Sequence, residues 1–205
     1  MNSPGLQHEA RVSIVSESGK IQAETEAALK AEEFKAIALP HIESIYRSAL
    51  RMAGNVSDAQ ELVQDSYLRA YRFFDKFKKG TNIKAWLLKI LRNLWINKYH
   101  KELRAPKMVD IRDIETSEAV KASETPEDRI FDGLLDDDIT CAIDSLPEYF
   151  RLAITLSDLE GLSYREIAEI MDCPVGTVMS RLYRGRKLLR ESLHDYAKRL
   201  GYVKY

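Results

Sequence analysis

Apolar residues recur at intervals of three and four in every strongly patterned segment of this 205-residue chain, which is the spacing of an amphipathic helix. The pattern predicts one helix over Glu32–Met52, which ends at Gly54-Asn55 because glycine readily adopts the backbone conformation of a helix C-terminus. A second helix is expected over Asp58–Phe74, and a third contains Trp86–Tyr99. No segment shows the alternation of a β-strand, so the predicted fold is all-α.

Short polar residues mark the expected starts of these helices. Ser57 or Asp58 can cap the second helix, and Glu61 is placed to complete a capping box. Thr81 or Asn82 can cap the third helix after the break at a glycine.

The second half of the chain predicts four more helices. The third of them has the clearest start, because Ser163 is followed three residues later by Glu166, which is a capping box. The other three are expected over Leu134–Ile143, Glu148–Leu159 (opened by Pro147 and closed by Gly161) and Val175–Leu193.

The charges are unevenly distributed, although the net charge of the chain is only −1. Residues 31–107 carry a net charge of +7, whereas residues 108–140 carry −8. The basic block indicates a polyanionic partner, and the alternative is that both blocks are solvated faces. Together with Pro106 and Pro126, the charges predict a flexible tail (1–30), a first helical domain (31–105), an acidic flexible linker (106–132) and a second small domain (133–200). The linker could screen the basic domain from DNA.

Several classes of protein are disfavoured by what the sequence lacks. No apolar run approaches the roughly 18 residues of a membrane span, and the N-terminus is not a signal peptide, so we expect a cytoplasmic protein. The two cysteines, Cys141 and Cys173, form no CxxC pair, and we interpret Cys173 as a small apolar turn residue rather than a redox switch. Common catalytic and phosphate-binding motifs are absent. We therefore expect no enzyme activity, no metal and no cofactor.

Residues 163–190 are typical of a helix-turn-helix, with a short helix, a tight turn and a longer helix. Ile167, Val178 and Leu182 can form the small core between the two helices. The second helix contains no acid from Val175 to Arg190, so it can bind DNA through phosphates and base edges. The alternative is an ordinary helical hairpin with a basic surface. The residues expected to be exposed are Thr177, Ser180, Arg181, Arg184 and Lys187.

A second nucleic-acid signature lies between Ser66 and Lys107, where 12 basic residues and two acids are interleaved with aromatic residues. Basic groups can follow a phosphate chain while aromatic rings stack on unpaired bases. The alternative is that these rings build the core of a three-helix domain. Phe77 is the better candidate for a base contact, and Trp86 is expected to be buried.

The helix over Asp58–Phe74 begins with an acidic face, on which Asp58, Glu61 and Asp65 share one side. From the residues alone, favourable acids near a helix N-terminus are the preferred interpretation, and a docking face for a basic partner is the alternative.

Four motifs carry a family resemblance: D-A-Q-E-L-V-Q-D-S-Y-L-R-A-Y, I-K-A-W-L-L-K-I-L-R-N-L-W-I-N-K-Y, S-L-P-E-Y-F-R and Y-R-E-I-A-E-I-M-D-C-P-V-G-T-V-M-S-R-L-Y-R-G-R. In order and spacing, over about residues 31–200, they resemble the extracytoplasmic-function (ECF, group 4) sigma factors of the sigma-70 family. The segments K-G-T-N-I-K-A-W and P-V-G-T-V-M-S-R-L look most like the branch linked to oxidative or thiol stress.

This resemblance implies that the first domain is sigma region 2, and it reverses the preferred interpretation of the acidic face. That face would bind the β′ clamp helices of core RNA polymerase. Another surface would recognise and melt the minus-10 promoter element, with one base flipped near Phe77 and Asn93. The implied polymerase contacts are Asp58, Glu61, Gln64, Asp65 and Leu68. The implied minus-10 contacts are Phe77, Lys78, Asn82, Lys84, Lys89, Arg92, Asn93, Ile96, Asn97 and His100.

The second domain would be sigma region 4, which contacts the polymerase β flap and the minus-35 duplex. Family members often carry a basic residue where this chain has Met179, so an apolar contact is expected there. The resemblance also implies a monomer when free and an anti-sigma factor as a partner, often zinc-containing in the thiol-stress branch. The implied minus-35 contacts are Val175, Gly176, Thr177, Met179, Ser180, Arg181, Tyr183, Arg184 and Lys187.

Three other classes compete with this interpretation. A stand-alone helix-turn-helix regulator explains residues 163–190 but leaves the acidic face unexplained, and it normally needs a dimer. A nucleic-acid enzyme would need metal-binding carboxylates, and the only dense cluster, Asp136–Asp138, is better explained as helix capping. A protein-binding adaptor is disfavoured by the arginine-rich last helix.

Overall fold

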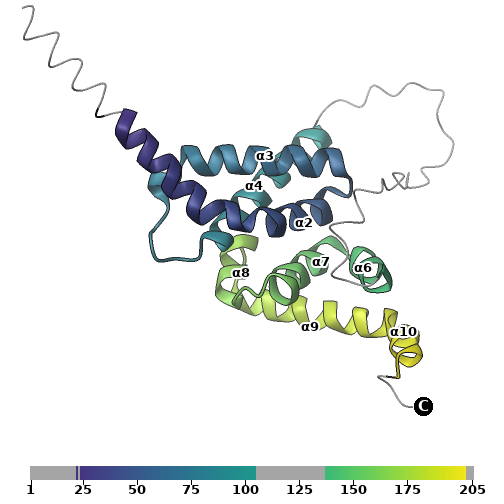
Figure 1. Cartoon of the computed structure of the whole chain (residues 1–205). Helices are drawn as coiled ribbons and strands as arrows, with labels where there is room; N and C mark the ends of the chain where they lie inside the picture. Colours follow the sequence, from purple (N-terminus) through teal and green to yellow (C-terminus); the bar gives the residue numbers. More distant parts are fainter. Residues whose placement is uncertain (1–21, 23, 105–136, 202–205) are drawn as a thin grey trace, which may run out of the picture. The chain divides into compact units, whose positions relative to one another are not determined.

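The computed structural model describes residues 22, 24–104 and 137–201 (Figure 1). These residues form helices, turns and connecting segments, and no strand occurs among them, so the prediction of an all-α fold is confirmed. In the same part of the chain, no helix combines the length and the hydrophobicity needed to cross a membrane. The predicted acidic linker (106–132) lies outside the described residues.

The chain divides into two compact units, Met1–Pro40 and His41–Tyr205. In the first unit, residues 24–38 are helical, so the helix begins inside the segment that the sequence predicted as a flexible tail. The single helix predicted over Glu32–Met52 is also wrong. A 3₁₀ turn, η1 (Leu39–His41), separates that helix from α2 (Ile42–Ala53), because Pro40 has no N–H to donate and its ring disfavours an uninterrupted α-helix.

The first half of the second unit contains α2, α3 (Val56–Arg72), a short 3₁₀ turn η2 (Phe74–Lys76) and α4 (Ile83–Arg104). Gly54 adopts the left-handed conformation that ends α2, as predicted. Asn82 caps α4 by accepting a hydrogen bond from the backbone N–H of Ala85 at 3.3 Å.

The predicted cap of α3 is wrong. Asn55, not Ser57 or Asp58, is the N-cap, and its side-chain oxygen accepts from the backbone N–H of Asp58 at 2.9 Å. The helix therefore starts at Val56, and Glu61 takes no part in a capping box. The sequence analysis assigned Asn55 to the end of the preceding helix. Only Gly54 and Asn55 connect α2 to α3, so Asn55 directly precedes α3 and caps it.

The second half contains α6 (Asp137–Asp144), α7 (Glu148–Ile154), a π-helical turn η3 (Thr155–Leu159), α8 (Tyr164–Met171), α9 (Val175–Ser192) and α10 (His194–Arg199). Gly161, at a φ of 67°, follows η3 where the sequence predicted the helix to close. Residues before Asp137, where an earlier start of α6 was predicted, lie outside the described part.

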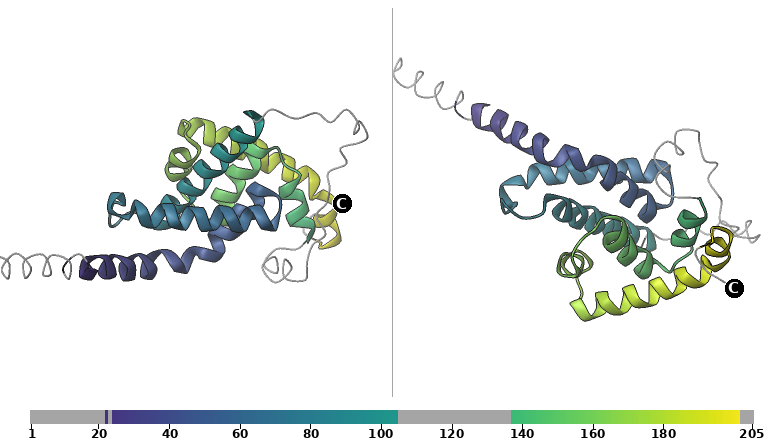
Figure 2. Two further views of the ribbon diagram at one scale, coloured as in Figure 1. Left: turned by 90° about the horizontal axis from the view of Figure 1, so that it is seen from above. Right: turned by 60° about the horizontal axis from the view of Figure 1, so that its bottom comes forward.

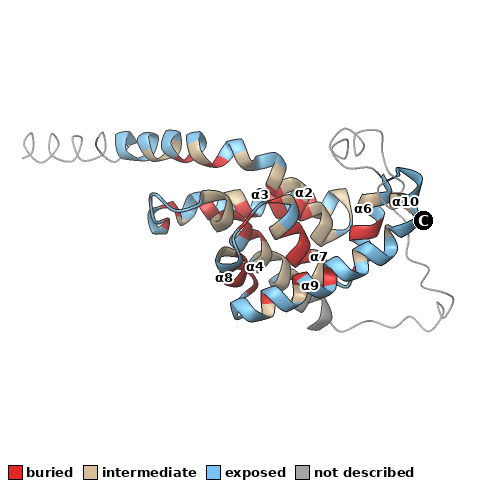
Figure 3. Ribbon diagram, turned by 90° about the horizontal axis from the view of Figure 1, so that it is seen from below, coloured by how far each residue is buried: buried red, intermediate tan, exposed pale blue. Residues whose placement is uncertain are grey.

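The core of the second unit runs through both halves. Within it, α2, α3 and α4 pack together, α7 packs against α9, and α8 packs against both α4 and α9 (Figure 2). Buried residues line the facing sides of these helices, whereas the outer side of α9 is exposed (Figure 3). Large side chains that are fully buried include Ile45, Leu87, Leu88, Leu91, Ile154, Leu156, Ile167, Ile170, Val178 and Leu182.

Candidate nucleic-acid interface

The predicted helix-turn-helix is confirmed as α8, a tight turn and α9. Ser163 and Glu166 form the predicted capping box, in which the backbone N–H of Ser163 donates to the Glu166 carboxylate at 2.8 Å. The hydroxyl of Ser163 chiefly keeps the pKa of Glu166 below its usual value. Asp172 ends α8 in the left-handed conformation, at a φ of 49°. Ile167, Val178 and Leu182 are buried between the two helices, as predicted.

The outer face of α9 presents a mixed polar, basic and apolar surface to solvent. Tyr183 is 74% exposed and Met179 is 51% exposed, so two large side chains are available for apolar contacts. Such contacts suit the methyl group of thymine in a major groove. Of the nine residues predicted for this surface, Thr177 and Arg181 are half-buried, and the exposed ones are Val175, Gly176, Met179, Ser180, Tyr183, Arg184 and Lys187.

Two arginines of α9 bind within their own half of the molecule. The guanidinium of Arg181 lies 4.8 Å from the centroid of the Tyr149 ring, and its Nη1 is 3.6 Å from Cys173 Sγ. Arg186 donates to both carboxylate oxygens of Asp158, at 2.6 and 3.1 Å. Arg181 was expected to be exposed, and this is wrong because its guanidinium packs on α7. The sequence carries no signal for either contact.

The sequence prediction for Phe77 and Trp86 is reversed in the structure. Phe77 is only 8% exposed, and its ring lies 6.1 Å from Phe74 and 5.2 Å from Trp86, centroid to centroid. Trp86 is half-buried. The reason is that the turn η2 folds Phe77 back onto the aromatic cluster, so this ring is a core residue in the described conformation.

The other residues predicted for the minus-10 surface lie on α4 or just before it. Lys78, Asn82, Lys89, Asn93 and Asn97 are exposed, and Asn93 and Asn97 share one face of α4 as predicted. Lys84, Arg92 and Ile96 are half-buried. The side chain of His100 lies outside the described residues.

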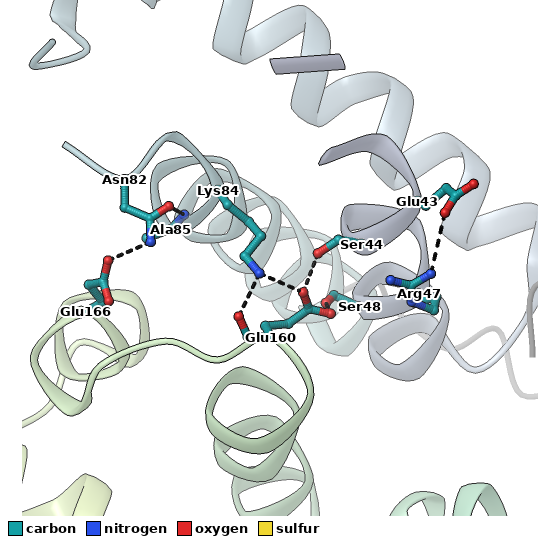
Figure 4. A network of polar contacts seen from close by, with 9 residues as sticks. All are labelled: Glu43, Ser44, Arg47, Ser48, Asn82, Lys84, Ala85, Glu160 and Glu166. Carbon is teal, nitrogen blue, oxygen red and sulfur yellow. Dashed lines mark hydrogen bonds and ion pairs between the residues drawn. The ribbon is translucent and has the colours of Figure 1, made fainter. Parts of the chain in front are cut away.

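Three of these residues contact the helix-turn-helix half of the molecule, and Figure 4 shows two of them, Asn82 and Lys84. The amide of Asn82 donates to Glu166 at 2.7 Å, and Lys84 donates to the main-chain carbonyl of Glu160 at 2.6 Å. Arg92 donates to the main-chain carbonyl of Met171 at 3.2 Å. Glu160 was missed by the sequence analysis, since an acid beside the glycine that ends a helix gives no sign of burial.

The acidic face of α3 is well formed. Glu61, Gln64 and Asp65 are exposed, and Leu68 is 60% exposed beside them. Asp58 is half-buried because it is bound by Asn55 and by Lys98 of α4, and these two hydrogen bonds hold the pKa of its carboxyl below the usual value. Lys98 also binds Glu61, at 2.7 Å. The face therefore combines carboxylates, two of them paired with Lys98, with an amide and an apolar side chain.

Among the residues that the structure describes, no group of three or more His, Cys, Asp and Glu side chains is arranged to hold a metal ion. Asp137 and Asp138 lie in the first turn of α6, and Asp138 is paired with Arg199 of α10.

Comparison with protein-family models gives two matches along the chain. Residues 39–105 match the model described as "Sigma-70 region 2", and residues 136–189 match the one described as "Sigma-70, region 4". The first match includes α2, α3 and α4, and the second includes the helix-turn-helix.

Two relatives are more than a third identical to this chain over the residues that align. The ECF RNA polymerase sigma factor SigE of Mycolicibacterium smegmatis is 37% identical over 157 residues, which are 77% of this chain and 60% of that protein. The ECF RNA polymerase sigma-E factor of Salmonella typhimurium is 38% identical over 147 residues, 69% of this chain and 77% of that protein.

Among solved structures, the sigma factor RpoE of Bartonella quintana, in complex with the anti-sigma factor NepR, matches with a TM-score of 0.63 and 32% identity. The match covers 80% of this chain and 98% of that one.

Proposed function

We propose that this chain, which belongs to the ECF sigma factors of the sigma-70 family, binds core RNA polymerase. The chain then brings the polymerase to promoters through two DNA-binding surfaces. As an alternative sigma factor it acts in transcription initiation. Its role is to position the polymerase and to open DNA, not to catalyse a reaction, and it works in the cytoplasm with the polymerase.

The single observation that carries this proposal is the coexistence of two different surfaces in one compact unit. The outer face of α9 is basic and exposed, as a helix that enters a DNA major groove must be. The α3 face, on the other half, is acidic. A stand-alone helix-turn-helix regulator has no use for the second surface, whereas a sigma factor needs a polymerase-binding face.

The α9 surface is proposed to bind the minus-35 duplex. Arg184 and Lys187 are exposed and suited to phosphates or guanine edges, while Met179 and Tyr183 supply apolar contacts. The exposed amides of Asn93 and Asn97 are proposed to contact the minus-10 element. Phe77 could reach an unpaired base only if the aromatic cluster opened, so we assign the exposed amides the leading role.

The acidic face of α3 is proposed to bind the clamp helices of the polymerase. Its carboxylates attract a basic partner, and Leu68 provides an apolar anchor at the centre of the contact. The second half of the molecule is proposed to contact the β flap.

An anti-sigma factor is the expected negative regulator, because the Bartonella quintana protein was solved with one. We propose that the chain belongs to the oxidative or thiol-stress branch, because its segments K-G-T-N-I-K-A-W and P-V-G-T-V-M-S-R-L resemble that branch, and that its anti-sigma factor contains zinc. Residues 31–105 and 133–200 are proposed as regions 2 and 4, joined by the linker 106–132 and preceded by the segment 1–30.

The test is in vitro transcription with purified core RNA polymerase on a pool of bacterial promoters, with and without the protein. New start sites that require the protein are the expected result, and their upstream sequences identify both promoter elements. Absence of initiation, together with tight duplex binding by the protein alone, would indicate a stand-alone regulator instead.

Two variants assign the surfaces in this assay. Asp65→Lys on the exposed α3 face is expected to reduce polymerase binding, measured on a sizing column, without changing the upstream sequences that are selected. Met179→Ala is expected to alter the minus-35 sequences selected while polymerase binding is unchanged. If both variants behave as the unmodified protein, the assignment of these surfaces is wrong.

A further inference from the structure

Tyr149 is a large, exposed side chain that lies beside the helix-turn-helix without belonging to it. It is in the first turn of α7 and is 60% exposed. None of the DNA or polymerase contacts expected from the sequence includes it. The guanidinium carbon of Arg181, on α9, lies 4.8 Å from the centroid of its ring, which is within the range of a cation–π contact. Tyr149 therefore contacts the proposed DNA-binding helix through a basic side chain.

The stacked guanidinium keeps its charge and most of its hydrogen-bonding capacity. In the part of the chain that the structure describes, its polar and ring contacts are the Tyr149 ring and Cys173 Sγ, and no carboxylate pairs with it. Arg186 differs, because it is bound by both carboxylate oxygens of Asp158. A ring covers only the face of a guanidinium, while the N–H donors point outward in its plane. Arg181 can therefore bind an anion without leaving Tyr149.

Arg181 lies on a flank of α9, between the buried side of the helix and its outer face. At 3.6 residues per turn, it shares this flank with Thr177, four residues before it, and with Arg184, three residues after it. A major groove is about 12 Å wide and a helix with its side chains is about 10–12 Å across, so the flanks of an inserted helix lie beside the phosphate backbones. The position of Arg181 thus suits a phosphate rather than a base edge.

The platform that Tyr149 provides is rigid. The helix α7 packs against α9, and its residues Leu152–Ile154 are buried. Tyrosine has only two rotatable side-chain angles, so little freedom remains once the helix is fixed. An unsupported arginine loses rotamer freedom when it binds a phosphate, and this loss weakens binding. Arg181, stacked on the ring, is already ordered before DNA binds.

We propose that Tyr149 is a positioning residue for minus-35 recognition, which holds Arg181 on the flank of α9 so that the guanidinium binds a phosphate of the minus-35 duplex. This role rests on the proposed function for the duplex that α9 binds, whereas the stacked pair is part of the structure. Through it, α7 takes part in DNA binding although it does not enter the groove. The affinity gained from Arg181 then depends on the residue at position 149.

The first experiment compares variants of the full-length chain, assembled with core RNA polymerase, in binding to a promoter duplex identified in the transcription assay. Tyr149→Leu is expected to weaken binding by about three- to tenfold, the size of a cation–π contact. Tyr149→Phe keeps the face of the ring and is expected to bind as the unmodified protein does. If Tyr149→Phe loses as much affinity as Tyr149→Leu, the hydroxyl acts rather than the ring face, and the positioning role is wrong.

Two further variants separate positioning from a structural effect. In an Arg181→Met background, Tyr149→Leu is expected to cause no further loss of affinity, because the ring then has no guanidinium to hold. Tyr196→Leu on α10 is the matched control, since this ring also stacks with an arginine, Arg199 at 5.8 Å, but outside the proposed DNA surface. We expect it to leave promoter binding unchanged. Additive losses from Tyr149→Leu and Arg181→Met, or an equal loss from Tyr196→Leu, would overturn the proposal.

A scan of the DNA backbone locates the contact. Each phosphate beside the minus-35 element is replaced in turn by an uncharged methylphosphonate, and binding is measured again. With the unmodified protein, we expect binding to fall at the phosphate that Arg181 contacts. Arg181→Met is expected to abolish that sensitivity, and Tyr149→Leu is expected to reduce it at the same place. A Tyr149→Leu protein that binds more weakly while its sensitivity pattern is unchanged would assign the ring a structural role only.

The stacked pair itself is measured in the free protein by NMR. The ring current of Tyr149 is expected to shift the Nε–H resonance of Arg181; Tyr149→Leu should remove this shift and Tyr149→Phe should retain it. An Arg181 resonance that Tyr149→Leu leaves in place would show that the pair does not form in solution. Failure of the proposed function is distinguishable, because it abolishes polymerase-dependent start sites but leaves this shift intact.

Discussion

Lys98 donates a hydrogen bond to Asp58 across 2.8 Å, so α4 binds directly to the start of α3. The same ammonium reaches Glu61. The hydrogen bonds with these two carboxylates raise the pKa of Lys98 well above its usual range, so it stays charged at any physiological pH. The acidic face therefore has one edge that is neutralised from within, and its free charge lies toward Asp65.

This contact predicts how Asp58 titrates. Hydrogen bonds from Asn55 first, and then from Lys98, hold the pKa of the Asp58 carboxyl below its usual value. A lowered carboxyl pKa contributes stability above the unfolded-state value, and that stability is lost as the pH falls through the folded-state value. Lys98→Met is expected to move the Asp58 titration, followed by NMR of its carboxyl carbon, to higher pH. Lys89→Met, on the exposed side of α4, should leave the titration where it is; a shift there too would contradict the contact.

The N-cap of α3 provides a second prediction. Asn55→Ala removes the side-chain acceptor for the backbone N–H of Asp58 and is expected to cost about 1 kcal/mol of unfolding free energy. Ser57→Ala, two residues on, is exposed and accepts nothing at the cap, so we expect a much smaller change. Urea denaturation of the two variants decides between the caps, and an equal loss for both would assign part of the capping to Ser57.

Gly185 permits a close approach of α9 to α7. A Cβ built on Gly185 lies 3.2 Å from Ile154 Cγ1 and 3.3 Å from Phe150 Cβ, which is tighter than ordinary contact. Overpacking costs about 1–3 kcal/mol, and the gain in helix propensity returns about 1 kcal/mol. Gly185→Ala is therefore expected to lower the thermal midpoint by a few degrees. Gly176→Ala, with open space around it, is expected to leave the midpoint unchanged or raise it.

The burial of Phe77 predicts a stability effect before any effect on promoter opening. Phe77→Ala removes a ring from the cluster with Phe74 and Trp86 and is expected to cost about 3–5 kcal/mol, measured on the free protein. Lys78→Ala, at the next residue, is exposed and is expected to change stability by less than about 0.5 kcal/mol. A Phe77→Ala protein of undiminished stability would show that the ring is not a core residue in solution.

Features that depend on neighbouring residues in the sequence were predictable. The capping box of Ser163 and Glu166 uses two residues three apart, and the left-handed Gly54 follows directly from the end of a periodic run. The cap of α3 was missed because Asn55 and Ser57 are both good capping residues, and the length of the connection decides between them.

Features that depend on distant residues were not predictable. Whether Phe77 or Trp86 is buried depends on how the turn η2 folds back, and both rings suit either environment. Ser44 and Glu160 are 116 positions apart in the sequence, and neither residue type by itself predicts a buried polar contact. The periodicity correctly assigned Ser44 and Trp86 to helices, but it could not identify the partners of any of these residues.

Two arginines of α9 that are two residues apart test the DNA surface with a built-in control. Arg184 is exposed on the outer face, whereas Arg186 is bound by Asp158 and Ser157. Arg184→Ala is expected to weaken binding to a promoter duplex by about 1–3 kcal/mol if it reads a base, or to reduce the salt slope by about one if it contacts a phosphate. Arg186→Ala is expected to lower thermal stability, because Asp158 loses its partner, while the salt dependence of DNA binding is unchanged.

Two measurements separate the two roles: fluorescence anisotropy of DNA binding over a range of salt concentrations, and thermal unfolding of the free protein. If Arg186→Ala weakens DNA binding as much as Arg184→Ala does, then its pairing with Asp158 breaks when DNA binds, and the DNA-contacting face of α9 extends to Arg186.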